Sequence, residues 1–240
     1  MSSDWKPPIM AWGTRPAPRG LSALTLIALA PAALSACHPG EFGGNRQAES
    51  SAQAASRTTP RTPPEEKSEE AETAQLRMAK AEGKAYQQSL AYMVGKVADG
   101  GGATQHSGDY LVAYAEEKAE GLYSLRNGRL DWVEPTNENA HLEISVSDAA
   151  DGRFIPYLHI TTTLTAPDGR TLGPFDMPFV WHPGLYHYGR NIVTPGGGAY
   201  TLRVRVDPPL FQRHDKINGR RYAQPVVVVF KNARFKTGKG

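Results

Sequence analysis

The sequence predicts an all-β fold, an immunoglobulin-like β-sandwich preceded by a short helix and a disordered tether. Three observations lead to this prediction. The 240-residue chain contains 24 glycines and 19 prolines, and this supply of turn-forming residues favours β structure over a helical bundle. Short apolar runs separated by turn signals follow residue 109. No helical period of useful length continues there, so about seven strands in roughly 130 residues suit a two-sheet sandwich.

Residues 1–36 have the composition of a bacterial signal peptide. Lys6, Arg15 and Arg19 precede an apolar stretch from Leu21 to Leu34, which at about 14 residues is short for a membrane span but typical of a signal-peptide core. A Leu-Ser-Ala-Cys sequence that ends at Cys37 follows directly and resembles a lipobox. We therefore expect cleavage before Cys37 and lipidation of its sulfur. A plain secretory signal with an incidental cysteine is the alternative.

Charge and cysteine content exclude several classes of protein. The formal net charge of +3 is too small for a protein that neutralises the phosphates of a nucleic-acid duplex. The single cysteine excludes a disulfide framework, a cysteine-based zinc cluster and a CxxC redox site. The sequence also contains no G-x-S-x-G, Walker A or H-E-x-x-H pattern, so common hydrolase, nucleotide and zinc-protease motifs are missing.

Residues 37–73 predict a disordered tether, and residues 74–104 a helix with a glycine-rich connection. The tether is rich in Ser, Thr, Pro and Glu, with scarcely a large apolar side chain, so it cannot bury enough surface to offset its ordering entropy. The following segment has apolar residues on one helical face, namely Tyr86, Leu90, Met93, Val94 and Val97. Gly100, Gly101 and Gly102 end that pattern.

Residues 105–240 form the predicted sandwich domain, which is long enough to bury a core without metal or disulfides. The expected strands are Tyr110–Ala115, His141–Ser147, Pro156–Leu164, Pro178–Trp181, Tyr200–Val206 and Pro225–Phe235.

One expected strand carries a histidine and a glutamate at alternate positions. Side chains of a strand alternate between its two faces, so Leu142 and Ile144 point to the core while His141 and Glu143 share the other face. A histidine and a carboxylate so placed can coordinate one metal ion. An exposed polar strand face is the alternative interpretation.

Three later segments add candidate ligands and charges. Residues 177–191 are dense in aromatic and histidine residues, among them His182 and His187. His214 lies just before the Asn218-Gly219 turn, where an exposed imidazole can reach a site built elsewhere. Three glutamates predict a solvated charged segment, with a second, carboxylate-rich ion site as the alternative: Glu116, Glu117 and Glu120.

Taken in order, these motifs resemble the periplasmic iron-transport-associated proteins. The resemblance runs from Asp109 to Phe235 and rests on His-Leu-Glu, Ile-Pro-Tyr-Leu, Met-Pro…His-Tyr-Gly…Asn, Tyr-x-Leu-x-Val-x-Val-Asp-Pro-Pro and Arg-His-Asp-Lys. Members of that family are bacterial immunoglobulin-like sandwiches, typically homodimeric, that bind copper and serve ferrous-iron uptake beside an iron permease. The resemblance implies the same for this chain.

The resemblance also implies a set of metal ligands, which fall here on His141, Glu143, Met177, His187 and His214. A thioether suits Cu(I), whereas imidazole and carboxylate can hold Cu(II). This chain departs from the family pattern, because it reads Met177-Pro178-Phe179 where the family usually reads Met-Pro-Met. If the family ligand is the second methionine, Phe179 replaces it and Met177 faces the other way. His182 is then the candidate replacement.

The sequence therefore predicts a lipid-anchored, periplasm-facing protein of the cell envelope that binds copper and assists ferrous-iron uptake by a membrane permease. Iron or another divalent metal is the alternative cofactor, and which bacterial membrane holds the anchor is left open. A homodimer is expected by resemblance, and nucleic acid is not an expected partner. We expect a binding accessory protein rather than an enzyme. Two alternatives are a metal-free adhesion or envelope-complex module and a copper-dependent iron oxidase.

Overall fold

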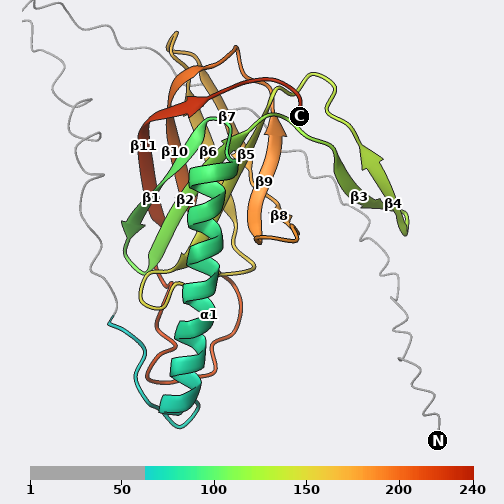
Figure 1. The fold of residues 1–240 in the computed structure, drawn as a ribbon. Helices are drawn as coiled ribbons and strands as arrows, with labels where there is room; N and C mark the ends of the chain where they lie inside the picture. The colour runs from blue at the N-terminus through green and yellow to red at the C-terminus, as the bar shows by residue number, and fades with distance from the viewer. Residues whose placement is uncertain (1–62) are drawn as a thin grey trace, which may run out of the picture. The chain divides into compact units, whose positions relative to one another are not determined.

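A computed structural model describes residues 63–240 (Figure 1). The expected signal peptide, Cys37 and the tether as far as residue 62 lie outside the described residues. The elements are α1 (Thr73–Tyr92), the π-helix η2 (Met93–Val97), β1 (Gly101–Ser107), β2 (Tyr110–Glu117), β3 (Leu122–Arg126), β4 (Arg129–Val133), β5 (Ala140–Asp148), β6 (Ile160–Thr165), β7 (Thr171–Asp176), β8 (Phe179–Val180), β9 (His187–Ile192), β10 (Gly198–Val206) and β11 (Val226–Phe235). Across residues 63–240, no helix has the length and apolar character needed to span a membrane.

Two antiparallel sheets form the domain, so the predicted β-sandwich is confirmed. One sheet has the strand order β1-β2-β5-β9-β8, and the other has the order β11-β10-β6-β7. A separate hairpin of β3 and β4 projects from the sandwich (Figure 1). Its Asn127-Gly128 turn has positive φ at both residues, which is the sequence signature of a two-residue hairpin turn.

The hydrophobic core lies between the sheets. Leu142 and Ile144 of β5 are fully buried there with Leu164 of β6 and Leu202 and Val204 of β10. Burial of each such side chain contributes about 1.5–3 kcal/mol to the free energy of unfolding. Because strand residues alternate, the intervening residues of β5 point to the outer face of the five-stranded sheet.

Helix α1 and η2 cover part of that outer face, as Figure 1 shows. Leu90 and Met93 pack with Ala113 and Ala115 of β2 and with Leu185. The small alanine side chains let the helix approach the sheet closely. The helix expected from the apolar pattern is therefore present and packed, and it begins at residue 73.

Tyr86 connects α1 to the strands beside it. Its hydroxyl donates to the carbonyl oxygen of Tyr186 at 2.7 Å and lies 2.8 Å from Ser145 Oγ. The helix is thus hydrogen-bonded both to β5 and to the loop that leads into β9.

Residues 63–72 differ from the disordered tether that was predicted. They contain no helix or strand but contact the loop between β10 and β11. The guanidinium of Arg221 is buried and lies 3.5 Å from Glu65 and 3.5 Å from Asp148. Ser68 Oγ donates to Asp215 at 2.7 Å. The physical reason is that a buried arginine needs anionic partners, and Glu65 is one of them.

Several strands were not expected from the sequence. β1 has a mostly polar, exposed sequence and is held by its backbone ladder to β2. β9 has buried residues on both faces at its start, so it lacks the alternation that identifies a half-buried strand. β9 nevertheless contributes residues to the site described below, because it pairs with β5.

Candidate metal centre

Two rows of directly opposed residues cross the outer face of the five-stranded sheet. One row consists of Glu117, His141 and Asn191, and the other of Ala115, Glu143 and Gly189, on β2, β5 and β9 respectively. His187, two residues before Gly189, also points to this face. Strand register therefore assembles the site from three segments that are far apart in the sequence.

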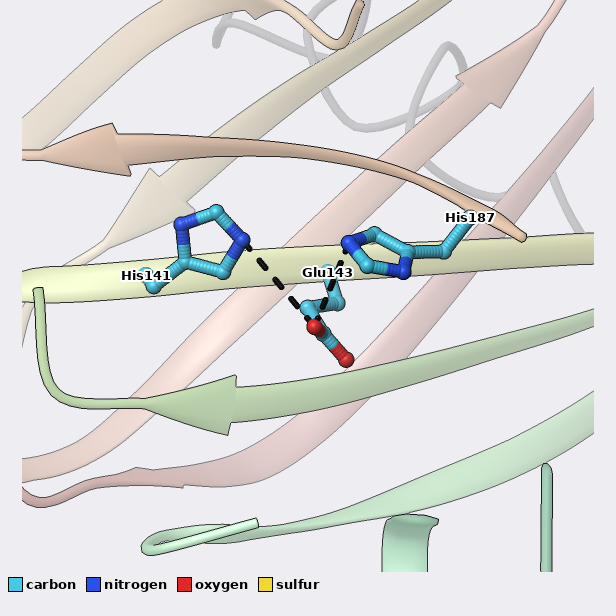
Figure 2. Close-up of side chains that lie close together, drawn as sticks. All are labelled: His141, Glu143 and His187. Atoms are coloured by element: carbon cyan, nitrogen blue, oxygen red, sulfur yellow. Dashed lines mark ion pairs between the residues drawn. The ribbon is translucent and has the colours of Figure 1, made fainter. Parts of the chain in front are cut away.

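His141, Glu143 and His187 come together and are all buried. Figure 2 shows the two imidazole rings on either side of the Glu143 carboxylate. Glu143 Oε1 lies 3.2 Å from His187 Nε2 and 4.0 Å from His141 Nε2. Two ligands that each bind one ion at about 2.0–2.2 Å lie roughly 3–4 Å apart, so these separations suit a single metal ion.

Hydrogen bonds fix the tautomer of both histidines. His141 Nδ1 lies 2.9 Å from Asn191 Oδ1, and His187 Nδ1 lies 3.2 Å from the carbonyl oxygen of Leu185. Both partners are oxygen acceptors, so each Nδ1 carries the proton and donates it. The Nε2 lone pairs are thereby free and point toward Glu143. This arrangement is typical of metal-binding histidines, whose other ring nitrogen is oriented by an acceptor.

Burial changes the protonation of all three groups. The pKa of His187 is lowered to about 4, by desolvation first and then by the neighbouring His141. Desolvation also lowers the pKa of His141. The pKa of Glu143 is raised to about 8, by burial first and then by the negative charges of Glu117 and Glu120. At neutral pH both imidazoles are therefore neutral, and the carboxyl group retains a proton in the absence of a cation.

Three polar atoms of this buried cluster have no hydrogen-bond partner among the described residues: His141 Nε2, His187 Nε2 and Glu143 Oε2. The Glu143 proton can serve at most one of the two nitrogens. Buried polar atoms are almost always paired, so their convergence indicates a site for a cation.

Gly189 leaves room for such an ion. A Cβ atom at this position would lie 3.0 Å from His141 Nε2 and 3.2 Å from His187 Nε2. A side chain would therefore enter the space between the two ligand nitrogens. The donor set and this space together fit a first-row transition metal.

Met177 is not part of this cluster. It is buried in the core between the sheets, and its sulfur accepts a hydrogen bond from Thr162 Oγ1 at 3.3 Å. Thr162 belongs to the opposite sheet, so Met177 lies on the inner face and the site on the outer face.

His182 lies beside the cluster. Its ring centroid is 6.1 Å from that of His187, and its side chain is exposed. Its Nδ1 accepts a hydrogen bond from the Gly184 amide at 3.1 Å, so the neutral ring carries its proton on Nε2 and must give up one of these arrangements before it can bind a metal. The structure thus brings the candidate replacement, rather than Met177, to the edge of the site.

Within one copy of the chain, His214 lies outside the cluster of His141, Glu143 and His187. Its side chain is 91% exposed, and its Nδ1 lies 3.0 Å from Glu70, just before α1. The neighbouring Asp215 accepts hydrogen bonds from Ser68 and Asn218 rather than from this imidazole.

The acidic segment is not a solvated face, contrary to expectation. Glu116 is fully buried, and its Oε2 accepts a hydrogen bond from the Lys236 amide at 2.9 Å. Burial raises its pKa to about 7. Glu117 is half-buried in the row with His141, and Glu120 Oε1 lies 3.7 Å from His141 Nε2. Because β2 continues as far as residue 117, Glu117 lies opposite His141, and Glu120 follows within reach of the same histidine.

Asn191 and Gly189 are site residues that sequence reasoning did not single out, and Glu120 was named only as part of the charged segment with Glu116 and Glu117. The first two lie in the His-Tyr-Gly…Asn motif, and their spacing after His187 was the available signal. Glu120 follows β2 in a short connection, and nothing in its local sequence indicates that it faces a histidine.

Comparison with known proteins shows that part of this domain is similar to a known family. Residues 132–236 match the family model described as Fe2+ transport protein. The UPF0423 protein of Brucella abortus (strain 2308) and that of Brucella suis biovar 1 are each 34% identical over 86 residues, 32% of this chain and 47% of theirs. The chain thus spans about half the length of the curated relatives it matches.

Two solved structures are also similar. FetP of uropathogenic Escherichia coli strain F11 is 21% identical, with a TM-score of 0.48 over 57% of this chain and 94% of that one. Copper-reconstituted P19 of Campylobacter jejuni is 20% identical, with a TM-score of 0.46 over 55% of this chain and 94% of that one. The resemblance seen in the sequence motifs is confirmed by the match of residues 132–236 to the family model described as Fe2+ transport protein.

Proposed function

We propose that this protein binds copper in the cell envelope and assists the uptake of ferrous iron by a membrane permease. The observation that carries the proposal is the convergence of His141, Glu143 and His187 on one buried point, where both Nε2 atoms and Glu143 Oε2 lack a hydrogen-bond partner among the described residues. The donor chemistry supports the choice of metal, because imidazole and carboxylate together suit Cu(II).

The metal, when bound, supplies a positive charge that the buried acceptors lack. His141 and His187 hold their lone pairs toward it because Asn191 and the Leu185 carbonyl take their Nδ1 protons. Glu143 must give up its proton before its carboxylate can bind the ion. Leu185 and η2 pack beside the site and restrict the access of water.

A titration of the purified protein with Cu(II), followed by thermal melting, tests metal binding. We expect one Cu(II) per chain and a raised midpoint, since an ion at 100 times its Kd stabilises the native state by about 2.7 kcal/mol. Substitution of His141→Ala or His187→Ala abolishes both effects. His159→Ala is the matched control, because His159 is exposed and pairs with Asp207. Stoichiometric binding retained in His187→Ala would overturn the proposal.

The match to the Fe2+ transport protein model and the expected lipobox support the proposed envelope location and iron permease. Replacement of Cys37 by serine is expected to move the protein from the membrane fraction to the soluble fraction of cells. Loss of the protein is expected to lower Fe(II) accumulation under iron limitation, and the His187→Ala variant is expected not to restore it. An unchanged rate of Fe(II) accumulation would leave a copper-binding protein without a role in iron uptake.

We also propose a homodimer, supported by exposed apolar surface beside the projecting hairpin. A groove of about 1570 Å³ lies between the hairpin and the sandwich. Exposed aromatic and aliphatic side chains line it, including Trp132, Tyr157, Phe179, Trp181 and Leu210. A two-stranded hairpin is marginally stable by itself, and a large exposed apolar surface marks an interaction site. Sedimentation should show a dimer that Trp132→Glu converts to a monomer.

A further inference from the structure

We infer that Glu120 is a further ligand of the proposed metal and completes a donor set of nitrogen and oxygen only, which matches the site to Cu(II) rather than Cu(I). This inference rests on the proposed copper site and specifies its ligands and the oxidation state that it holds.

The carboxylate of Glu120 lies at the open side of the buried cluster. Its Oε1 is 3.7 Å from His141 Nε2, whereas the ligand atoms of His141, Glu143 and His187 all lie within 4.8 Å of one another, so the Glu120 side chain must turn further inward to share their ion. His141 is fully buried, and its Nε2 has no hydrogen-bond partner among residues 63–240. The side chain of Glu120 is 41% exposed, so it reaches the cluster from the solvent side.

Asn191 holds Glu120 and His141 in this arrangement. Its Oδ1 accepts the Nδ1 proton of His141 at 2.9 Å and lies 3.3 Å from the Glu120 amide nitrogen. Its Nδ2 donates to the Glu120 carbonyl oxygen at 2.7 Å. One buried amide therefore orients the histidine ligand and fixes the backbone of the glutamate. A site positioned by its supporting hydrogen bonds is preorganised for a metal.

No basic residue competes for the Glu120 carboxylate. Within the described part of the chain, its ion-pair contact is with His141 and not with a lysine or arginine. Burial raises the pKa of Glu120, and the nearby His182 opposes that effect. An incoming cation thus meets Glu120 together with Glu143, and two carboxylates favour a divalent over a monovalent ion.

The described methionines leave the site without an evident sulfur ligand. The sulfur of Met177 is bonded to Thr162 between the sheets, and Met78 is exposed on α1. Met93 lies on the site's side of the sheet but packs in an apolar cluster with Leu90 and Leu185. Cu(I) is selected by thiolate and thioether ligands, whereas imidazole and carboxylate ligands hold Cu(II).

Copper titrations of the full-length protein and two glutamate variants test the role of Glu120. We expect Glu120→Gln to weaken Cu(II) binding by about 10- to 100-fold and to change the electron paramagnetic resonance spectrum of the bound ion. Glu82→Gln, at an exposed position on α1, is the matched control and should behave as the wild type. If Glu120→Gln binds Cu(II) with unchanged affinity and spectrum, Glu120 is not a ligand, although the proposed copper site stands.

The absence of sulfur is tested separately. X-ray absorption at the copper edge is expected to show nitrogen and oxygen neighbours alone, and Met93→Leu is expected to leave the spectrum unchanged. Reduction with ascorbate is expected to transfer the copper to the Cu(I) chelator bicinchoninate. A sulfur neighbour that disappears in Met93→Leu, or Cu(I) retained against the chelator, would overturn the inference. Failure of the wild type to bind Cu(II) at all would instead defeat the proposed function.

Discussion

Gly189 lies directly opposite Glu143 in the ladder between β5 and β9, and a Cβ atom on it would lie between the ligand nitrogens of His141 and His187. Its backbone does not have positive φ, so conformational freedom does not explain a glycine here. The space that a side chain would fill over its Cα explains the glycine instead. A carboxylate on one strand and a missing side chain on the next together create room for an ion on a sheet face.

Gly189→Ala tests this explanation. The new Cβ would contact His141 Nε2 and His187 Cδ2 at 3.0 Å, so both rings must shift from the positions in which they can share an ion. We expect Cu(II) affinity to fall by roughly 10- to 100-fold, measured by competition with a chelator of known strength. Gly95→Ala is the control, since nothing lies within 4 Å of its added Cβ. Equal affinities in both variants would mean that the ion lies elsewhere.

Asn191→Ala is expected to disturb two ligands at once. The His141 ring loses the acceptor that fixes its tautomer, and the backbone of Glu120 loses both of its contacts with the amide. Loss of such supporting hydrogen bonds costs about 10- to 100-fold in metal affinity and about 1–3 kcal/mol in stability. Asn191→Asp retains an acceptor for His141 and should recover part of the affinity. No difference between the two variants would contradict the positioning role.

The stability of the metal-free protein should decrease as pH rises from 6.5 to 8. Glu143 has a pKa of about 8 in the folded chain and an ordinary value of 4.5, so the folded state binds the proton more tightly and loses that advantage as pH rises. The loss across this window is about 1–2 kcal/mol. His187 contributes in the opposite sense only at lower pH, between 6.5 and about 4.

Glu143→Gln isolates this effect, because the amide does not titrate. Urea unfolding at several pH values should show the stability of the variant falling less steeply than that of the wild type between pH 6.5 and 8. Parallel pH profiles would show that the Glu143 carboxyl is not protonated in the folded chain.

Binding of Cu(II) should release a proton at neutral pH. Glu143 is largely protonated below its pKa of about 8, whereas the imidazole of His187, with a pKa of about 4, is already neutral. The metal must displace the Glu143 proton, so affinity should rise up to tenfold per pH unit below 8. Calorimetry in buffers of different ionisation enthalpy measures the released proton. Release near zero at pH 7 would indicate that Glu143 does not bind the ion.

His214→Ala distinguishes a ligand within one chain from a ligand supplied by another. In a single copy, His214 is exposed and pairs with Glu70, so we expect the variant to retain one Cu(II) per chain, unlike His187→Ala. Titration of both variants under the same conditions checks this. Loss of binding in His214→Ala would mean that a second copy of the chain brings this imidazole to the site.

The sequence by itself determined the relations that arise from local periodicity. The alternation of β5 placed His141 and Glu143 on one face and Leu142 in the core. The helical period of Tyr86, Leu90 and Met93 likewise gave the face that packs on the sheet. These relations are carried by residues two to four positions apart, so backbone geometry fixes them before any tertiary contact forms.

Tertiary structure alone decided which distant segments meet. Pairing of β9 with β5 brought His187 close to Glu143, although β9 lacks a strand-like pattern. The same pairing put Asn191 opposite His141 and Gly189 opposite Glu143. The continuation of β2 and its turn brought Glu120 to His141. Met177 went to the inner face, because the alternation of a short strand depends on where its pairing begins. Strand register is a non-local property, set by how two sheets bury their apolar faces together.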